Sequence, residues 1–307
     1  MALIHHHGEV IAIDSFMHGR QGITAVYYLD GPKPAIIEAA PASSLDHVLK
    51  GLEEAGVERL EWIVLTHIHL DHAGAAGHLA GRFPEARVVV RSEGAPHLAD
   101  PSRLWASAAR LYPDMEERWG SILPIPESRI EAISTDGPVA DLGDGRVLDA
   151  VYAPGHAKHQ MVLFERKSGD LFVGDAIGVY LPEAGAIRPA TPPPEFDLEL
   201  SLATIENLRR LSPTRVFPTH FGPVPNVEAA FDEGALRMRQ WVGRAEEALG
   251  SGGGIEEVVK AFQEHARDDY AHLDADLLEK FEQTTSYALN AAGIVRYLQK
   301  RAEAARL

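Results

Sequence analysis

The segment that decides the fold is Thr66-His67-Ile68-His69-Leu70-Asp71-His72-Ala73-Gly74, in which three histidines and one aspartate fall within six positions. An uninterrupted apolar run, Trp62–Leu65, precedes it and is consistent with a buried strand. Imidazole and carboxylate side chains are suitable ligands for zinc, iron or manganese. Alternate residues at the end of a strand can point one way, while residues entering the next helix, expected over Ala73–Arg82, point another. This one segment could therefore serve two neighbouring metal ions.

Three later segments repeat one design, in which a ligand-type residue follows a short apolar run. They are Val151–His156, Leu171–Asp175 and Arg215–His220. Gly155 and Gly174 precede the first two ligand-type residues and allow a tight turn or a close backbone approach. Each of these ligand-type residues alone would equally well be a helix cap or a surface side chain. Together with the first motif they bring the ligand-type side chains to seven, which is enough for two metal ions.

Composition and charge narrow the class of protein. Of 307 residues, 45% are hydrophobic, which is ordinary for a globular protein with a sizeable core. A net charge of −16, without a cluster of lysine and arginine, disfavours nucleic acid as a partner. The absence of cysteine excludes disulfides, thiol catalysis and cysteine-ligated zinc. The N-terminal residues do not have the pattern of a signal peptide, and no run approaches the roughly 18 apolar residues of a membrane span. We therefore expect a cytoplasmic protein without a membrane partner.

The sequence pattern changes near residue 226. Before it, strand-like runs alternate with helices, and helices joined by a loop are expected over 99–119. Four prolines in the segment 188–195 prevent a regular helix or a central strand, which predicts a stiff surface connection. After residue 226 the strand pattern ends, and helices are expected over 227–249, 255–266 and 277–304, the last with a break near Gly293. We predict a catalytic domain over residues 1–226 and a helical region over 227–307.

The order of these motifs resembles that of a known family. An HxHxDH segment, then Pro-Gly-His, Gly-Asp and a histidine after a late strand are similar to the metallo-β-lactamase superfamily, and within it to the glyoxalase II-like hydrolases. The resemblance covers about residues 8–225. It implies an α/β fold, a four-layer αβ/βα sandwich of two mixed sheets between outer helices, here followed by the helical region.

The resemblance also implies how the ligands are shared between two metal ions. His67, His69 and His156 would bind one ion. Asp71, His72 and His220 would bind the other, and Asp175 would bridge the two. Zinc is the expected metal, with iron and manganese as alternatives, because histidine and aspartate accept all three.

The chemistry implied is hydrolysis. A hydroxide that bridges the two metal ions would attack a small ester-like substrate such as a thioester or a lactone. The C-terminal region does not match the residues with which glyoxalase II-like enzymes hold glutathione, which disfavours a glutathione thioester and leaves other ester-like substrates open. That region would either contribute substrate contacts or only pack and oligomerise, and a homodimer is possible.

Several further side chains are weaker candidates. Besides Asp71, the expected catalytic residues are His159, which could line the pocket or act as an acid, and Tyr180, which could donate to an oxyanion. An exposed loop position for His159 and simple packing for Tyr180 are the competing interpretations. Thr66 could orient a ligand through its hydroxyl. The histidines at positions 5–7 are expected to be surface residues rather than a metal-binding tract.

Three other functions remain open. The first is an iron-dependent dioxygenase or a diiron oxygen-reactive protein, although the presence of Asp71, His72 and His220 disfavours a single-iron site. Flavodiiron proteins also carry a flavodoxin domain, which this sequence lacks. The second is a phosphodiesterase or nuclease, which the acidic charge disfavours. The third is a metal-binding protein without catalysis.

Overall fold

The computed structural model describes residues 3–110 and 114–306, and the chain divides into two compact units. The first unit comprises Met1–Tyr152, His159–Gly174 and Thr214–Pro223. The second comprises Ala153–Lys158, Asp175–Pro213 and Val224–Leu307. Composition predicts a boundary at residue 226, whereas compactness also places 175–213 with the C-terminal helices. The division into a catalytic domain and a helical region stays a prediction. Part of the loop expected within 99–119 falls on residues 111–113, outside the described residues.

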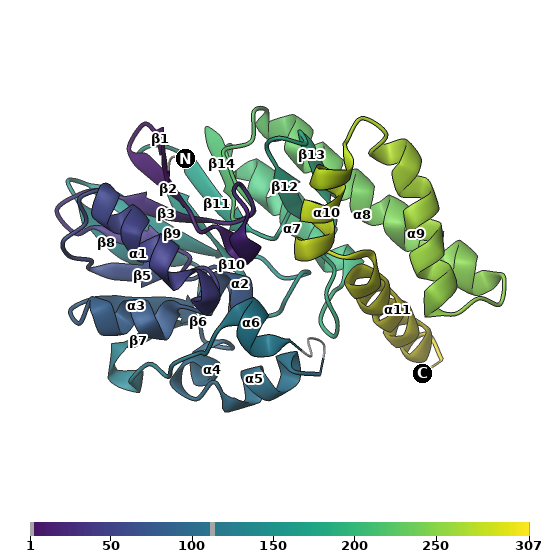
Figure 1. Ribbon diagram of the computed structural model, residues 1–307, viewed down its shortest axis with the longest axis horizontal. Coiled ribbons are helices and arrows are strands. Elements are labelled where there is room, and N and C mark those ends of the chain that lie inside the picture. The colour runs from purple at the N-terminus through teal and green to yellow at the C-terminus, as the bar shows by residue number, and fades with distance from the viewer. Residues whose placement is uncertain (1–2, 111–113, 307) are drawn as a thin grey trace. The chain divides into compact units, whose positions relative to one another are not determined.

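One mixed sheet of the first unit carries the histidine-rich segment (Figure 1). Within the described residues its strands are, in spatial order, β1 (Ile4–His7), β2 (Val10–Asp14), β3 (Ala25–Leu29), β4 (Ala35–Ile37), β5 (Trp62–Val64), β6 (Arg87–Arg91) and β7 (Ile130–Ile133). Strands β1 to β4 pair antiparallel, and β4 to β7 pair parallel. Parallel pairing brings the carboxyl ends of β4, β5 and β6 to one edge of the sheet.

The second sheet of this unit contains the strands that precede the ligand-type residues of the three later motifs. Its strands are, in spatial order, β14 (Arg215–Pro218), β11 (Asp170–Gly174), β10 (Met161–Glu165), β9 (Arg146–Tyr152) and β8 (Gly137–Gly143). Strands β9 and β11 both pair antiparallel to β10, and β14 pairs parallel to β11. The strands β9, β11 and β14 therefore run in the same direction. As a result, the residues that follow them leave the sheet at one edge.

The core of the first unit has two layers. On β3 all five residues are buried, so the strand is covered on both faces. Tyr27 packs toward the second sheet, with its ring centroid 5.3 Å from that of Phe172 and 5.4 Å from that of Phe217. Val26 and Tyr28 point the other way and join the apolar faces of helices α1 (Leu45–Glu54) and α3 (Ala76–Arg82). The mixed sheets and helices of the expected α/β fold are thus confirmed.

The second unit is mainly helical. Its elements are the hairpin β12 (Val179–Leu181) with β13 (Ala186–Arg188), and helices α7 (Leu198–Arg210), α8 (Val227–Gly250), α9 (Ile255–Asp269), α10 (Ala275–Thr284) and α11 (Tyr287–Ala304). Trp241, Phe262 and Phe281 lie at the centre of its apolar core. Among the described residues, no helix combines the length and the apolar character needed to cross a membrane.

Short helices complete the first unit. They are α2 (Leu70–Ala73), α4 (Ala95–Ala99), α5 (Ser102–Ala108) and α6 (Met115–Trp119), with 3₁₀ turns at Met17–Gly19, Ala42–Ser44 and Glu127–Arg129. The helix predicted over Ala73–Arg82 is α3, which begins at Ala76, and a separate short helix, α2, ends at Ala73. The histidines at positions 5–7 form most of β1, the strand that pairs with β2.

Two predictions in the second unit are wrong. The C-terminal helix is broken at Thr285, before the N-cap Ser286 of α11, and Gly293 lies inside α11. The connection after β13 is not wholly on the surface, because Pro189, Ala190 and Thr191 are buried. Both errors have one cause, since α11 packs directly on this connection: a Cβ on Gly293 would meet the carbonyl oxygen of Thr191.

Candidate metal centre

The histidine-rich segment changes direction where the sequence pattern predicts. Residues His67 and His69 follow β5 in an extended stretch, and His69 is the N-cap of α2 with φ −61° and ψ 154°. Asp71 and His72 lie in the first turn of that helix. Thr66 is fixed at the strand end, where its carbonyl accepts a hydrogen bond of 2.9 Å from the backbone N–H of Met161.

A buried carboxylate, which sequence reasoning missed, lies beneath this segment. Glu38 follows β4, is fully buried, and has φ +70°, in the left-handed region. Its Oε1 accepts hydrogen bonds from the hydroxyls of Thr66 (2.5 Å) and Thr219 (2.7 Å) and from Nδ1 of His72 (3.0 Å). Its Oε2 accepts from the backbone N–H of Thr66 at 3.3 Å. A buried charge is tolerated when hydrogen bonds satisfy its oxygens in this way.

The same carboxylate orients two histidine rings. Because a carboxylate accepts, Nδ1 of His72 carries the proton and Nε2 is left with its lone pair. The only hydroxyl proton of Thr66 is given to Glu38, so its oxygen accepts from Nδ1 of His67 at 3.0 Å. Nε2 of His67 therefore also keeps a lone pair that can bind a metal ion. This contact supports the orienting role predicted for Thr66.

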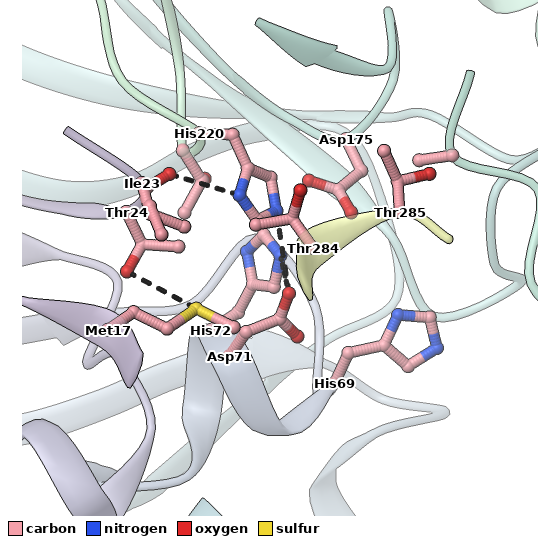
Figure 2. Close-up of polar contacts among 12 residues, drawn as sticks. Met17, Ile23, Thr24, His69, Asp71, His72, Asp175, His220, Thr284 and Thr285 are labelled. Carbon is pink, nitrogen blue, oxygen red and sulfur yellow. Dashed lines mark hydrogen bonds and ion pairs between the residues drawn. The ribbon is translucent and has the colours of Figure 1, made fainter. Parts of the chain in front are cut away.

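Backbone carbonyls orient two further rings. Nδ1 of His220 lies 3.2 Å from the carbonyl oxygen of Ile23, and Nδ1 of His156 lies 2.9 Å from that of Ala190. Since a carbonyl oxygen accepts, both Nδ1 atoms carry protons and both Nε2 atoms face inward. Figure 2 shows His220 between Ile23 and Asp71, with one ring nitrogen directed at each.

The ligand-type side chains lie in two groups, in each of which the candidate ligand atoms are within 4.8 Å of one another. One group is His67, His69 and His156, and the other is Asp71, His72, Asp175 and His220. Nε2 of His67 is 3.0 Å from Nδ1 of His69. In the second group, Oδ2 of Asp71 is 3.6 Å from Nε2 of His72 and 3.4 Å from Nε2 of His220. Nε2 of His156, in the first group, is 3.5 Å from Oδ2 of Asp175, in the second.

The chemistry of these donors fits divalent transition metals. Each group combines imidazole nitrogens with, in the second group, carboxylate oxygens, the ligands that zinc, iron and manganese accept. Asp71 and Asp175 are 14% and 5% exposed, and burying two carboxylates is costly unless cations compensate them. The outer nitrogens of four rings already donate to protein acceptors, so the inner nitrogens are arranged for coordination.

The two weaker catalytic candidates differ in their surroundings. The ring of His159 lies 5.9 Å from that of His67, nearly parallel, and 5.3 Å from that of His69, at a right angle. It is 8% exposed, so the exposed loop position considered for it is not found. Tyr180 lies on β12 opposite Ile187 and is buried, and burial followed by the nearby Glu233 raises the pKa of its phenol. The catalytic role of either residue stays a prediction.

This chain belongs to the metallo-beta-lactamase superfamily, whose sequence profile matches residues 2–220. Among similar proteins is a metallo-beta-lactamase fold-containing protein of Sulfurisphaera tokodaii, 29% identical over 210 residues, which are 66% of this chain and 74% of that protein. A hydroxyacylglutathione hydrolase of Synechococcus is 27% identical over 206 residues, which are 67% of this chain and 66% of that protein.

A solved structure shares the fold. The crystal structure of an archaeal metallo-beta-lactamase superfamily protein from Sulfolobus tokodaii aligns with a TM-score of 0.67 and 24% identity. The alignment covers 89% of this chain and 93% of that one. The α/β metallo-beta-lactamase fold with C-terminal helices is therefore the fold of this protein. The superfamily is one of metallo-hydrolases, and this chain has clusters of histidine and aspartate that could hold metal ions.

Proposed function

We propose that the protein is a dinuclear metal-dependent hydrolase that acts on a small ester-like substrate, a thioester or a lactone. The observation that carries the proposal is the pair of neighbouring ligand groups, which together hold seven donor side chains. The relative from Synechococcus, whose name describes hydrolysis of a hydroxyacylglutathione, supports an ester-like bond. The acidic net charge supports a small molecule over a nucleic acid as substrate.

The donor set suits hydrolysis at neutral pH. When bound, divalent metal ions lower the pKa of water to about 7 and polarise a carbonyl oxygen. The protein's part is to hold the two groups in place: Glu38 and the carbonyls of Ile23 and Ala190 fix the rings whose inner nitrogens would bind. Only Asp71 and Asp175 contribute negative charge to the two groups, so a pair of divalent cations would keep the centre positive and favour an anionic oxygen on the substrate.

The remaining roles follow from position and protonation. His159 lies beside the rings of His67 and His69, where it could exchange a proton with a substrate held at the first group. The raised pKa of Tyr180 keeps its phenol protonated well above neutral pH, so its hydroxyl could donate a hydrogen bond to a substrate oxygen. We assign His159 the transfer of a proton and Tyr180 the binding of a substrate oxygen.

The proposal is tested by metal analysis followed by turnover. The protein is stripped with a chelator, reloaded separately with Zn²⁺, Fe²⁺ or Mn²⁺, and assayed on thioesters, lactones and phosphodiesters. We expect about two metal ions per chain and hydrolysis of a thioester or lactone without consumption of oxygen. A chain that takes up no metal, or one that forms only oxygen-dependent products, would contradict the proposal.

Asp175→Ala tests the shared carboxylate. Removing it should lower metal content and decrease turnover about 1000-fold or more, because a metal centre contributes several kcal/mol to catalysis and each 1.4 kcal/mol is tenfold. Asp268→Ala, on the exposed surface of α9, is the matched control and should behave as the wild type. Normal turnover in Asp175→Ala would refute the bridging role.

A further inference from the structure

We propose that Asn290, on the last helix of the chain, is a positioning residue for His156. In this view the C-terminal helices are part of the scaffold of the metal site, because they hold the backbone that orients this ring. The inference rests on the proposed function, since it treats His156 as a metal ligand. It gives the helical region a role that composition does not suggest.

The ring of His156 is held from one side by a backbone carbonyl. His156 is buried, and its Nδ1 donates to the carbonyl oxygen of Ala190 at 2.9 Å. Its opposite nitrogen, Nε2, lies 3.5 Å from Oδ2 of Asp175. The position of one carbonyl oxygen therefore decides both which nitrogen of His156 carries the proton and where the other nitrogen points.

The residues on either side of Ala190 are themselves hydrogen-bonded to the C-terminal helices. The backbone N–H of Thr191 donates to Oδ1 of Asn290 at 2.8 Å, and the Thr191 hydroxyl donates to the same oxygen at 2.6 Å. On the other side, the hydroxyl of Thr285 donates to the carbonyl of Pro189 at 2.5 Å. The peptide groups flanking Ala190 are thus tied to Thr285, between α10 and α11, and to Asn290, near the start of α11.

Both ends of the Asn290 amide are hydrogen-bonded. Its Nδ2 donates to Oγ1 of Thr285 at 2.7 Å and to the carbonyl oxygens of Ser286 (3.1 Å) and Thr285 (3.3 Å). The side chain is completely buried. An amide is suited to this place because it offers an acceptor to one segment and donors to the other. No aliphatic side chain of similar size could replace both functions.

Two further contacts fix α11 against the same connection. At Gly293 an added Cβ would lie 1.7 Å from the carbonyl oxygen of Thr191, so only glycine allows the helix this close an approach. Arg188, at the end of β13, is fully buried and pairs with Glu282, while its Nη2 donates to the hydroxyl of Tyr287 at 2.9 Å. The segment that carries Ala190 therefore contacts α10 and α11 just before this residue, at Arg188, and just after it, at Thr191.

The physical consequence follows from the kind of acceptor. A backbone carbonyl is neutral, and it can orient a histidine ring only if its own peptide group is fixed in place. If the connection moved by about 1 Å, the ring would lose its partner, and such displacements are enough to impair a metal or catalytic site. Loss of an outer-shell contact typically costs 10–100-fold in metal affinity, and a contact acting through an intervening peptide belongs at the lower end.

The experiment compares Asn290→Ala with Gln299→Ala, an amide on the exposed face of the same helix. Two quantities are measured: the dissociation constants of Co²⁺ or Zn²⁺, and, in the metal-free protein, the ¹⁵N shifts of the His156 ring, assigned with His156→Gln. We expect Asn290→Ala to bind one of the two ions about 10-fold more weakly and to lose the single Nδ1–H form of the ring. Gln299→Ala should match the wild type in both.

The outcomes separate this inference from the proposed function. If folded Asn290→Ala keeps the Nδ1–H form and the wild-type metal affinities, the positioning role is wrong. If the wild type itself binds no metal, the proposed function fails, while the ring shifts still test the contact. Should Asn290→Ala not fold, the isosteric pair Thr191→Val with Thr285→Val removes the two hydroxyls. An unchanged His156 ring in that variant would overturn the inference.

Discussion

Two of the candidate metal-binding histidines are oriented by a charged side chain, and two by backbone carbonyls. His72 directly, and His67 through Thr66, depend on the carboxylate of Glu38. His220 and His156 depend on carbonyl oxygens of loops. The first arrangement needs only side chains near the ends of strands, while the second needs whole segments to be held in place. The difference teaches that one site can be sensitive both to single side chains and to distant packing.

Among substitutions at the groups that orient the rings, Glu38→Gln should decrease metal affinity the most. With the amide oxygen in the place of Oε1, the NH2 group faces the backbone N–H of Thr66 and leaves it unsatisfied. The neutral oxygen is also a weaker acceptor than the carboxylate for the donors of Thr66, Thr219 and His72. We expect the group around His72 to bind metal about 100-fold more weakly and the metal-free protein to lose about 2–3 kcal/mol of unfolding free energy. Metal titration and urea unfolding measure the two effects.

Glu303→Gln, on the exposed surface of α11, is the matched control for the charge change. If Glu38→Gln bound metal and unfolded like this control, the carboxylate would not be the common support of the two rings.

Thr66→Val should have a smaller and more selective effect. The substitution keeps the shape of the side chain but removes the hydroxyl that passes the influence of Glu38 to His67. We expect about 10-fold weaker metal binding by the His67 group and a loss of about 1 kcal/mol in stability. Thr214→Val, at an exposed position, is the control. A larger loss at the His72 group than at the His67 group would contradict the relay through Thr66.

The last effect, on stability rather than on metal affinity, concerns the loop that carries Ile23, because this loop also carries His18. Burial, followed by the charge of Arg118, lowers the pKa of His18 to about 4, below the 6.5 expected when the chain is unfolded. The neutral ring therefore contributes stability that is present above pH 6.5 and is lost as the pH falls toward 4. Acid should thus destabilise the loop whose Ile23 carbonyl orients His220.

His18→Asn tests this pH dependence. Asparagine tolerates the left-handed backbone at this position, where φ is 54°, and does not titrate. Between pH 6.5 and 4.5 the metal-free wild type should lose about 1–2 kcal/mol more unfolding free energy than the variant, allowing for the partial exposure of the ring. Parallel curves of stability against pH for the two proteins would show that His18 is not responsible.

The helix break illustrates what composition misjudges. Gly293 is a plausible break in a sequence of helix-forming residues, yet it is helical because the backbone of Thr191 occupies the space of its missing side chain. The actual break falls at Thr285, where Ser286 caps the next helix by accepting from the backbone N–H of Leu289. A capping serine is visible in the sequence, but so are many serines that cap nothing.

By itself the sequence determined the strand before each motif and the seven ligand-type residues, because these are local patterns, and the α/β class came from the family resemblance that the motifs carry. Only the tertiary structure decided which groups hold those residues. Glu38 and Asn290 are ordinary polar residues in the sequence, and their importance comes from complete burial beside donors and acceptors of distant segments. A polar side chain acquires such a role when folding removes water and leaves it one set of partners, and no spacing in the chain records which partners those will be.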